Sequence, residues 1–514
     1  MNKKTFYIST PIYYPSGNLH IGHLLTTTLA WVYKNYKANQ NYDTFFVTGI
    51  DEHGQKILKK AIENNLDPQT YVDMQCQKFI DLWKKLDIDY DFFSRTTSLQ
   101  HTQTIELIFN KMLEKGLIYK GAYEGLYSVE DEEFFTKTQA LLIDNQYYHP
   151  TSKHLLQEVS EESYFFNMEK FTPWIKEFFE TNSDFLTNDA TKKELMNNFI
   201  NQGLSDLSVT RIAFDWGIKV LKNQTPQHVI YVWLDALFNY LTALNIYSDN
   251  DDNYLKFWKN GDERVHVLAK EISRFHAIYW PIFLKSLDIN LPTKEVIHSW
   301  IITPEGKMSK SKGNVIEPLP LIEKYGAEEI KYFFSSQVNI NNDFSFSEDL
   351  LINVLNADLA NNFGNLLNRV AKMVNQSFEN GTTYIASQLT SIDCEIYTLL
   401  KENYDEYKLH FNEFNADKAF KKAIQFSSKL NEYIDRTEPW KLKENPERLN
   451  VVLNTLLNGI YAVNYMLNPV LKQKTRKINE FLNINEFSET KLFDFTKFDN
   501  VKVDVKEILF PRIK

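Results

Sequence analysis

The chain has 514 residues, which is more than one hydrophobic core usually serves, so two or three domains are expected. Hydrophobic residues make up 43% of the sequence, and no apolar run approaches the roughly 18 residues that predict a membrane helix, so we expect a cytoplasmic protein without a membrane partner. The formal net charge of −10 argues against binding nucleic acid through an overall positive field and requires a local basic patch instead.

The first segments predict a parallel α/β sheet. Residues 4–10 are apolar and favour a strand, a loop follows, and 19–36 carry apolar residues at helical spacing. Residues 43–50, "DTFFVTGI", repeat the strand pattern, and the turn "DEHG" leads into a helix over 55–64. Ligands bind outside the carboxyl ends of strands in open sheets of this kind. The turns "HIGH" and "DEHG" are therefore expected to meet in one crevice.

The residue composition changes in the middle of the chain. Aromatic and acidic segments such as "YEGLYSVEDEEFF" predict an inserted subdomain, after which "HVIYVWLDA" and "RVHVLAKEI" predict two further buried strands of the sheet. Beyond "DFSFSED" the pattern becomes helical, starting with 353–375. The predicted divisions are 1–120 and 226–320 for the two halves of the sheet domain, 121–225 for the insertion, 321–350 for a linking region and 351–514 for a helical bundle.

A histidine pair lies at the predicted start of the helix over 19–36, in His20-Ile21-Gly22-His23. Histidines at a helix start are often structural, and on this motif alone that interpretation stays open. A metal site is less well supported, because the sequence has no H-E-x-x-H and no thiolate pair nearby. Gly22 allows a ligand to approach the backbone at a helix N-terminus, which favours phosphate. The glycine patterns of NAD-binding and P-loop folds are absent.

A second motif lies nearly three hundred residues later, in "WIITPEGKMSKSKGNVIEP". Taken alone, Lys307, Lys310 and Lys312 could be only a solvated basic run. The two motifs in this order, each after a strand-like run, are hard to explain by coincidence.

The motifs "HIGH" and "KMSKS" in this order resemble the class I aminoacyl-tRNA synthetases. The segments "TPIYYPSGNLHIGH", "FVTGIDEHGQKI", "GLSDLSVTR", "YVWLDAL", "RFHAIYWP" and "NADLANNFGNLLNR" narrow the resemblance to the methionyl-tRNA synthetase family over essentially the whole chain. It implies an α/β, Rossmann-like parallel-sheet catalytic domain with an inserted connective-peptide subdomain, followed by an all-α anticodon-binding helical bundle. It also implies that L-methionine and ATP with Mg²⁺ form methionyl-adenylate and pyrophosphate. Methionine is then transferred to tRNA(Met), including initiator tRNA.

The resemblance assigns the catalytic groups to the two motifs. The implied reaction requires no protein nucleophile, so catalysis depends on positioning and on stabilising charge at phosphate oxygens. His20 and His23 are expected to act as donors, and Lys307 and Lys310 to close over the departing pyrophosphate. The other expected ATP contacts are Gly22, Glu271, His298 and Met308.

The resemblance also assigns the methionine site. Asp51 is expected to pair with the substrate ammonium, and a turn Asp that caps the following helix is the alternative. Aromatic surfaces suit a thioether, since sulfur–ring contacts contribute about 0.3 to 1.5 kcal/mol. The expected side-chain pocket consists of Ile12, Tyr14, Trp233, Ala236, Leu237, Tyr240, Ile272 and His276. Arg211 is expected to support the active site through neighbouring groups.

The sequence departs from the family pattern in two places. Ala269 and Glu271 stand where a glycine and an aspartate are common, which puts the ribose contact in doubt. Many relatives hold zinc in the connective peptide, but the only cysteines here are Cys76 and Cys394, and Ser128 stands at a position often held by one. We therefore expect no structural zinc.

For tRNA, the resemblance assigns recognition of the anticodon to Asn361, Asn365, Arg369, Pro439 and Trp440. Residues four apart share a helix face, so the first three are expected to project together. An exposed Trp can stack an unpaired base, worth about 1 to 3 kcal/mol, whereas a buried Trp440 in the bundle is the alternative. Little sequence follows the bundle, so a monomer is expected.

Two other functions remain open. A class I synthetase for leucine, isoleucine or valine would be expected to carry a large editing domain, and one for cysteine a thiolate-bound zinc, which this sequence does not provide. A synthetase-like module that holds tRNA without turning over ATP is the second alternative. The intact His20, His23, Lys307 and Lys310 argue against it.

Overall fold

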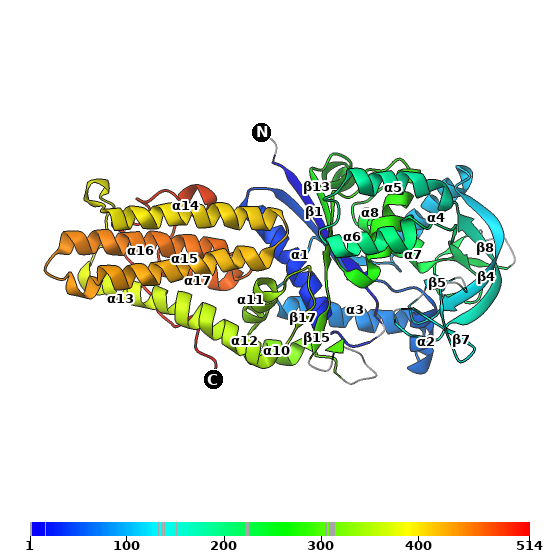
Figure 1. Ribbon diagram of the computed structural model, residues 1–514, viewed down its shortest axis with the longest axis horizontal. Coiled ribbons are helices and arrows are strands. Elements are labelled where there is room, and N and C mark those ends of the chain that lie inside the picture. The colour runs from blue at the N-terminus through cyan, green and yellow to red at the C-terminus, as the bar shows by residue number, and fades with distance from the viewer. Residues whose placement is uncertain are drawn as a thin grey trace.

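A parallel five-stranded sheet lies at the centre of the molecule, between an insertion at one end and a helical bundle at the other (Figure 1). The computed structural model describes residues 3–514 except 16, 132, 136, 138, 151, 221–225, 304–305 and 308–313, with the backbone alone at 134 and 307. In spatial order the strands are β14 (Lys294–His298), β13 (Glu263–Ala269), β1 (Thr5–Tyr13), β2 (Asp43–Ile50) and β3 (Phe92–Arg95). The predicted α/β fold is confirmed.

The winding of this sheet reverses beside β1. The chain adds β2 and then β3 on one side of β1, and later adds β13 and β14 on the other, with every neighbouring pair parallel. In open α/β sheets such a reversal opens a crevice outside the carboxyl ends of the strands. The helices between the first strands are α1 (Ile21–Asn39), α2 (Gln55–Glu63) and α3 (Pro68–Lys85), and α4 (Leu99–Glu114) follows β3.

The insertion is built on a long antiparallel pair, β4 (Ile118–Ser128) and β8 (Gln157–Phe166). β5 (Glu133–Phe135) and β9 (Leu207–Ser208) complete its four-stranded sheet, and β6 (Leu141–Ile143) and β7 (Gln146–Tyr148) form a separate hairpin. Helices α5 (Thr172–Thr181) and α6 (Asp189–Leu195) follow β8. The insertion sheet therefore starts three residues before the predicted division at 121 and returns near Ser208.

The prediction that "HVIYVWLDA" is a strand of the central sheet is wrong. Only β12 (His228–Ile230) is extended, and it pairs with β10 (Thr210–Arg211) and β11 (Lys219–Val220) in a small antiparallel sheet. The rest forms α7 (Val232–Leu237), followed by α8 (Asn239–Thr242). The β-branched and aromatic residues favour a strand locally, but packing of the buried faces of Leu234 and Leu237 overrides that preference. "RVHVLAKEI" does supply a central strand, β13.

The helical bundle predicted for the end of the chain is confirmed. After α9 (Trp280–Ser286) and β14, the short strands β15 (Ile301–Thr303), β16 (Gly306–Lys307) and β17 (Phe344–Ser345) form a small sheet, and α10 (Pro318–Tyr325) and α11 (Ala327–Gln337) lie between the last two. The bundle consists of α12 (Glu348–Val354), a π-helical stretch (Leu355–Gly364), α13 (Asn365–Ser377), α14 (Ser391–Asn412), α15 (Ala416–Thr437), α16 (Pro446–Leu467) and α17 (Lys472–Phe481).

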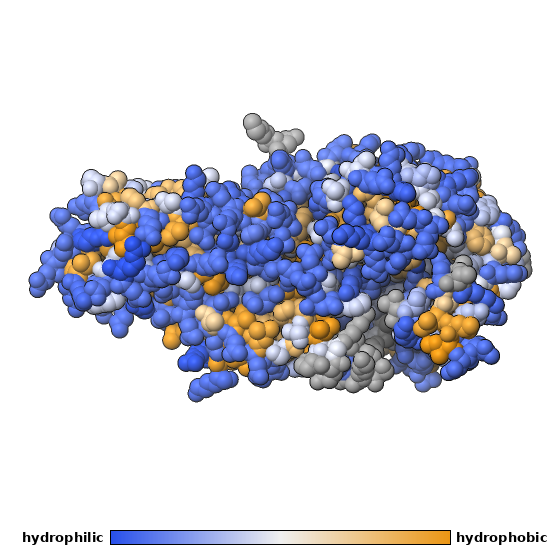
Figure 2. Space-filling model, in the orientation of Figure 1, coloured by the Kyte–Doolittle hydropathy of each residue, from blue (hydrophilic) through white to orange (hydrophobic). Residues whose placement is uncertain are grey.

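Helix α1 connects the sheet to the bundle. Tyr33 donates a hydrogen bond to the carbonyl of Phe414 at 2.5 Å, and the Asn35 amide donates to the carbonyl of Pro469 at 3.1 Å. One hydrophobic core runs without interruption from β1 through α1 into the bundle helices. Hydrophilic residues dominate the face shown in Figure 2. None of the described helices has the length and apolarity to cross a membrane.

Candidate active site

A cavity of about 460 Å³ lies at the carboxyl ends of β1 and β13, where the winding of the sheet reverses. It is lined by the loops after β1, β2, β13 and β14, by the start of α1 and by α7. The cavity brings together these predicted site residues: Ile12, Tyr14, His20, Gly22, His23, Asp51, Trp233, Ala236, Leu237, Tyr240, Glu271, Ile272, His276 and His298. Residues predicted separately for ATP and for methionine therefore share one cavity.

The two histidines of the first motif cap helix α1. His20 Nδ1 accepts the backbone N–H of Gly22 at 3.1 Å, and His23 Nδ1 accepts the backbone N–H of His20 at 3.1 Å. A neutral imidazole carries one proton, so the proton of each ring must then lie on Nε2. The cap therefore turns both rings into Nε2–H donors at a helix N-terminus, where the helix dipole already favours an anion.

Gly22 is required by the ring of His20. A Cβ at position 22 would lie 2.8 Å from His20 Cε1 and 2.9 Å from His20 Nδ1, closer than real Cβ atoms approach other atoms. The sequence suggested that this glycine makes room for the ligand. In the structure the space is filled by the capping imidazole, so the glycine allows the cap itself to form.

The proton positions in the part of the cavity predicted to bind methionine follow from its hydrogen bonds. Burial lowers the pKa of His276 to about 4, so the ring is neutral at physiological pH. Its Nδ1 lies 3.0 Å from the carbonyl of Ile272 and must donate, so Nε2 accepts the hydroxyl proton of Tyr240 at 2.7 Å. Trp233 stacks on Phe275 with ring centroids 3.6 Å apart and completes an aromatic wall.

Asp51 is buried in the turn after β2, and its backbone N–H donates to the carbonyl of Tyr13 at 2.9 Å. The alternative role of Asp51 as a helix cap is wrong. Helix α2 starts after Gly54, whose φ is 111°, and no side chain caps it. The structure thus places the carboxylate in the cavity without a capping role.

Two predicted ATP contacts are already bonded to protein groups. His298 Nδ1 donates to the carbonyl of Ser299 at 2.8 Å, and burial lowers the pKa of the ring, so its Nε2 accepts from the Thr26 hydroxyl at 2.8 Å. The exposed Glu271 accepts from the indole N–H of Trp300 at 2.7 Å. We therefore expect His298 to meet ATP through its ring rather than through its nitrogens.

Other predicted residues lie apart from this cavity. Arg211 does not line it, because its guanidinium is buried beside Glu161 at 2.5 Å and over the ring of Tyr127 at 4.2 Å, within the insertion. Support of the active site by Arg211 stays a prediction. Met308 and Lys310 lie outside the described residues, as does the side chain of Lys307, whose backbone belongs to β16.

The predicted anticodon residues lie at the surface of the bundle, apart from one. Asn361 and Asn365 are exposed, Arg369 is half-buried, and Trp440 is 46% exposed, so the alternative of a buried Trp440 is wrong. Pro439, the residue before it, is buried. Asn361 belongs to the π-helical stretch, yet it remains on the solvent side with Asn365.

Comparison with known proteins identifies the family. A model of the family "tRNA synthetases class I (M)" matches residues 6–146 and 140–371. The chain belongs to the methionyl-tRNA synthetase family. It is 54% identical over 512 residues to the methionine–tRNA ligase of Mycoplasmopsis pulmonis, covering 100% of both chains. It is 41% identical over 524 residues to the methionine–tRNA ligase of Bacillus subtilis, covering 99% of this chain and 78% of that relative.

Solved structures of the family share the whole fold. Mycobacterium tuberculosis methionyl-tRNA synthetase in complex with methionyl-adenylate superposes with a TM-score of 0.91 at 28% identity, covering 99% of this chain and 100% of that chain. The apo form of the same enzyme gives a TM-score of 0.87 at 26% identity, covering 100% of this chain and 99% of that chain. The prediction of the family from sequence motifs is confirmed.

Several cavity residues were missed by sequence reasoning. Glu130 and Asp131 reach the cavity from the tip of the insertion, and the ammonium of Lys56 on α2 donates to the carbonyl of Glu130 at 2.6 Å. Arg274, which follows β13, forms an ion pair with Glu133 in the same tip. The acidic run "VEDEE" was visible in the sequence, but no spacing signals that it folds back over the sheet.

Replacing Gly22 with Ala should disable the side of this cavity at the start of α1, where the predicted ATP contacts lie. The new Cβ would displace the His20 ring, which removes an N-cap worth about 0.5 to 2 kcal/mol. The displaced ring would also no longer direct its Nε2–H into the cavity. Loss of a single oriented donor typically lowers turnover about 100- to 1000-fold, and we expect a fall of that order in adenylate formation. Gly217→Ala is the control, because its Cβ would lie an ordinary 3.4 Å from Val229 Cβ. Equal activity of the two variants would contradict this reason for Gly22.

Proposed function

We propose that the chain is a methionine–tRNA ligase that activates L-methionine with ATP and transfers it to the 3′ end of tRNA(Met). The observation that carries the proposal is the single cavity in which a helix start with two oriented imidazoles faces a buried carboxylate and an aromatic pocket. An anion site and an amino-acid site within one cavity fit the reaction of a carboxylate with a nucleotide phosphate. Membership of the methionyl-tRNA synthetase family supports the same conclusion.

In the first step a carboxylate oxygen of methionine attacks the α-phosphorus of ATP. The bond between this phosphorus and the bridging oxygen to the β-phosphate breaks, and pyrophosphate leaves with Mg²⁺, which enters as part of the substrate. The Nε2–H groups of His20 and His23 donate to phosphate oxygens, on which negative charge builds up. Asp51 pairs with the substrate ammonium and orients the carboxylate. In the second step a hydroxyl of the tRNA 3′ adenosine attacks the carbonyl carbon, and AMP leaves.

We further propose how the chain is divided. Residues 1–120 and 226–320 form the catalytic domain, 121–225 the connective peptide, 321–350 a linking region and 351–514 the anticodon-binding domain. The protein acts in the cytoplasm as a monomer, and initiator tRNA is among its substrates. The continuous core between α1 and the bundle supports a fixed arrangement of the catalytic and anticodon-binding regions.

The deciding experiment is amino-acid-dependent exchange of labelled pyrophosphate into ATP. We expect exchange with methionine and none with leucine, isoleucine, valine or cysteine, because Asp51 and the aromatic pocket fit a thioether amino acid. Lys310→Ala should lose adenylate formation and keep methionine binding, since the proposal assigns Lys310 to the departing pyrophosphate and not to the amino acid. Exchange with another amino acid would overturn the pocket assignment. No exchange in a folded preparation that binds ATP would favour the module that holds tRNA without turnover.

The insertion is proposed to fold without zinc. In its place, Asp131 accepts hydrogen bonds from Ser128 Oγ at 2.6 Å, Ser152 Oγ at 2.8 Å and His154 Nδ1 at 2.9 Å. Among the described residues no group of three metal-ligating side chains is assembled. We expect metal analysis after extensive dialysis to find less than stoichiometric zinc, and Asp131→Asn to lower the thermal stability of the insertion. Bound zinc at one equivalent would contradict the proposal.

The surface of the bundle at Trp440 is proposed to bind the anticodon. Loss of a stacked base costs about 1 to 3 kcal/mol, so Trp440→Ala should raise KM for tRNA about 5- to 150-fold and leave pyrophosphate exchange unchanged. Phe493→Ala is a matched control, because Phe493 is a bundle aromatic with a similar exposure of 44%. An equal KM for tRNA in both variants would place the contact elsewhere.

A further inference from the structure

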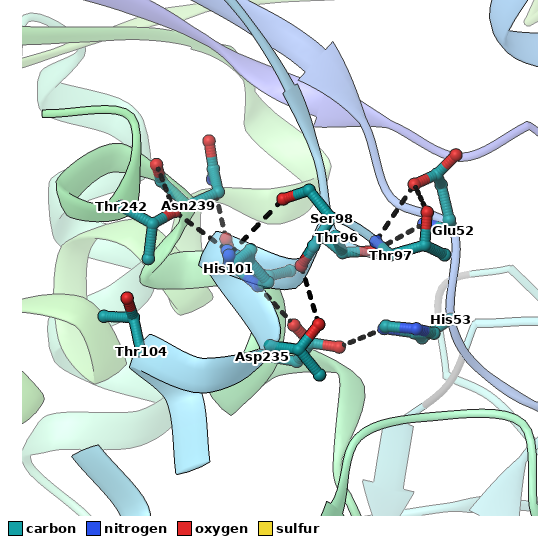
Figure 3. A network of polar contacts seen from close by, with 12 residues as sticks. Glu52, His53, Thr96, Thr97, Ser98, His101, Thr104, Asp235, Asn239 and Thr242 are labelled. Atoms are coloured by element: carbon teal, nitrogen blue, oxygen red, sulfur yellow. Dashed lines mark hydrogen bonds and ion pairs between the residues drawn. The ribbon is translucent and has the colours of Figure 1, made fainter. Parts of the chain in front are cut away.

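A fully buried carboxylate, Asp235, joins two parts of the cavity wall (Figure 3). One of its oxygens accepts from His101 Nε2 on α4 at 2.6 Å, and the other lies 2.7 Å from His53 Nδ1 in the turn after β2. Burial alone would raise the pKa of Asp235, but the charge and hydrogen bonds of the two histidines outweigh it and hold this pKa below its usual value. The group therefore stays a carboxylate that accepts from both rings.

On one side, Asp235 fixes the short helix α7. Trp233, Ala236 and Leu237 of this helix line the cavity, whereas Asp235 does not. Residues three and four apart share a helix face, so these three form one wall, and Asp235 points away from it toward α4 and the turn. Apolar packing of Leu234 and Leu237 holds α7 in the core, and Asp235 adds directional hydrogen bonds that fix the rotation of this six-residue helix.

On the other side, Asp235 holds the turn that carries Asp51. His53 follows Asp51 by two residues, and its carbonyl accepts from the hydroxyl of Tyr14, another cavity residue, at 2.9 Å. Glu52 of the same turn is buried and accepts from the Thr97 hydroxyl at 2.7 Å. Arg95 Nε at the end of β3 also donates to Glu52 at 2.8 Å, so the turn is anchored to β3 and the segment after it through Glu52, and to α7 through His53.

We propose that Asp235 is a positioning residue that sets the span between Asp51 and the side-chain wall on α7. The inference rests on the proposed function, in which Asp51 binds the substrate ammonium. A ligand held at both ends must match this span, so a fixed wall selects the length of the amino-acid side chain. A carboxylate can accept from both imidazoles at once, whereas an amide at this position would direct N–H toward one of them.

The test compares Asp235→Asn with Asp393→Asn in methionine-dependent pyrophosphate exchange. Asp393 is a matched control, because it is also fully buried and pairs with Arg448 at 2.8 Å, but lies in the bundle. We expect Asp235→Asn to raise KM for methionine about 10-fold or more, with KM for ATP within about twofold, since only the amino-acid span changes. Its preference for methionine over ethionine, which is longer by one methylene, should fall. Asp393→Asn should change neither quantity.

Two variants at His53 separate positioning from a general loss of stability. His53→Asn keeps a donor near the place of Nδ1 and should retain a low KM for methionine, whereas His53→Phe keeps a ring without the donor and should reproduce Asp235→Asn. His53→Phe decides the question if Asp235→Asn does not fold. Equal rises in KM for methionine and ATP, or no rise in either, would overturn the proposal. Absence of methionine-dependent exchange in the unaltered chain would instead contradict the proposed function.

Discussion

The burial of helix α1 fixes the place of the cavity at its first turn and the position of the helical bundle relative to the sheet. Almost the whole helix is enclosed between the sheet and the bundle, and even Lys34 and Lys37 are buried, paired with Asp89 and Glu263. A helix held along its length cannot change direction, so its first turn points at a fixed place outside β1. The Nε2–H groups of the two imidazoles that cap this turn, together with the positive end of the helix dipole, define where an anion can bind. The position of the bundle is set by the same helix, which relates the cavity to the surface that carries Trp440.

Three buried histidines in and beside the cavity are neutral and contribute no positive charge to it. Burial lowers the pKa of His266, His276 and His298, and their hydrogen bonds fix which nitrogen carries the proton. His266 shows the pattern: the Trp280 indole donates to its Nε2 at 3.1 Å, so its Nδ1 donates to Ser9 at 2.6 Å. These rings orient groups without adding positive charge. In the proposed reaction, the charge that balances the phosphates would come from the helix dipole, from Mg²⁺ bound to the substrate ATP, and from the lysines of the second motif.

The parts of the fold that were predicted correctly from sequence are those with local signals. The first two strand-loop-helix units follow from periodicity and turn residues, and β2 has the predicted ends. The helix at α7 was missed because its residues favour a strand when considered alone. Asp235 could not be recognised as a positioning residue, since His53 lies 182 positions away and His101 134 positions away. The motif around Gly22 was recognised, but its steric reason, the ring of His20, depends on a rotamer that no sequence pattern encodes.

The tip of the insertion shows how the cavity depends on a region far from the sheet. Glu130 and Asp131 line the cavity, so the shape of the tip is part of the site. Burial of Asp131 would raise its pKa, but hydrogen bonds from Ser128, His154 and Ser152 lower it, which keeps a carboxylate at the centre of the tip. Arg274 ties the same tip to the segment after β13 through its ion pair with Glu133. A carboxylate that accepts several hydrogen bonds can hold two chain segments together as a metal would. These hydrogen bonds require an ionised Asp131, which links the shape of this side of the cavity to the protonation of Asp131.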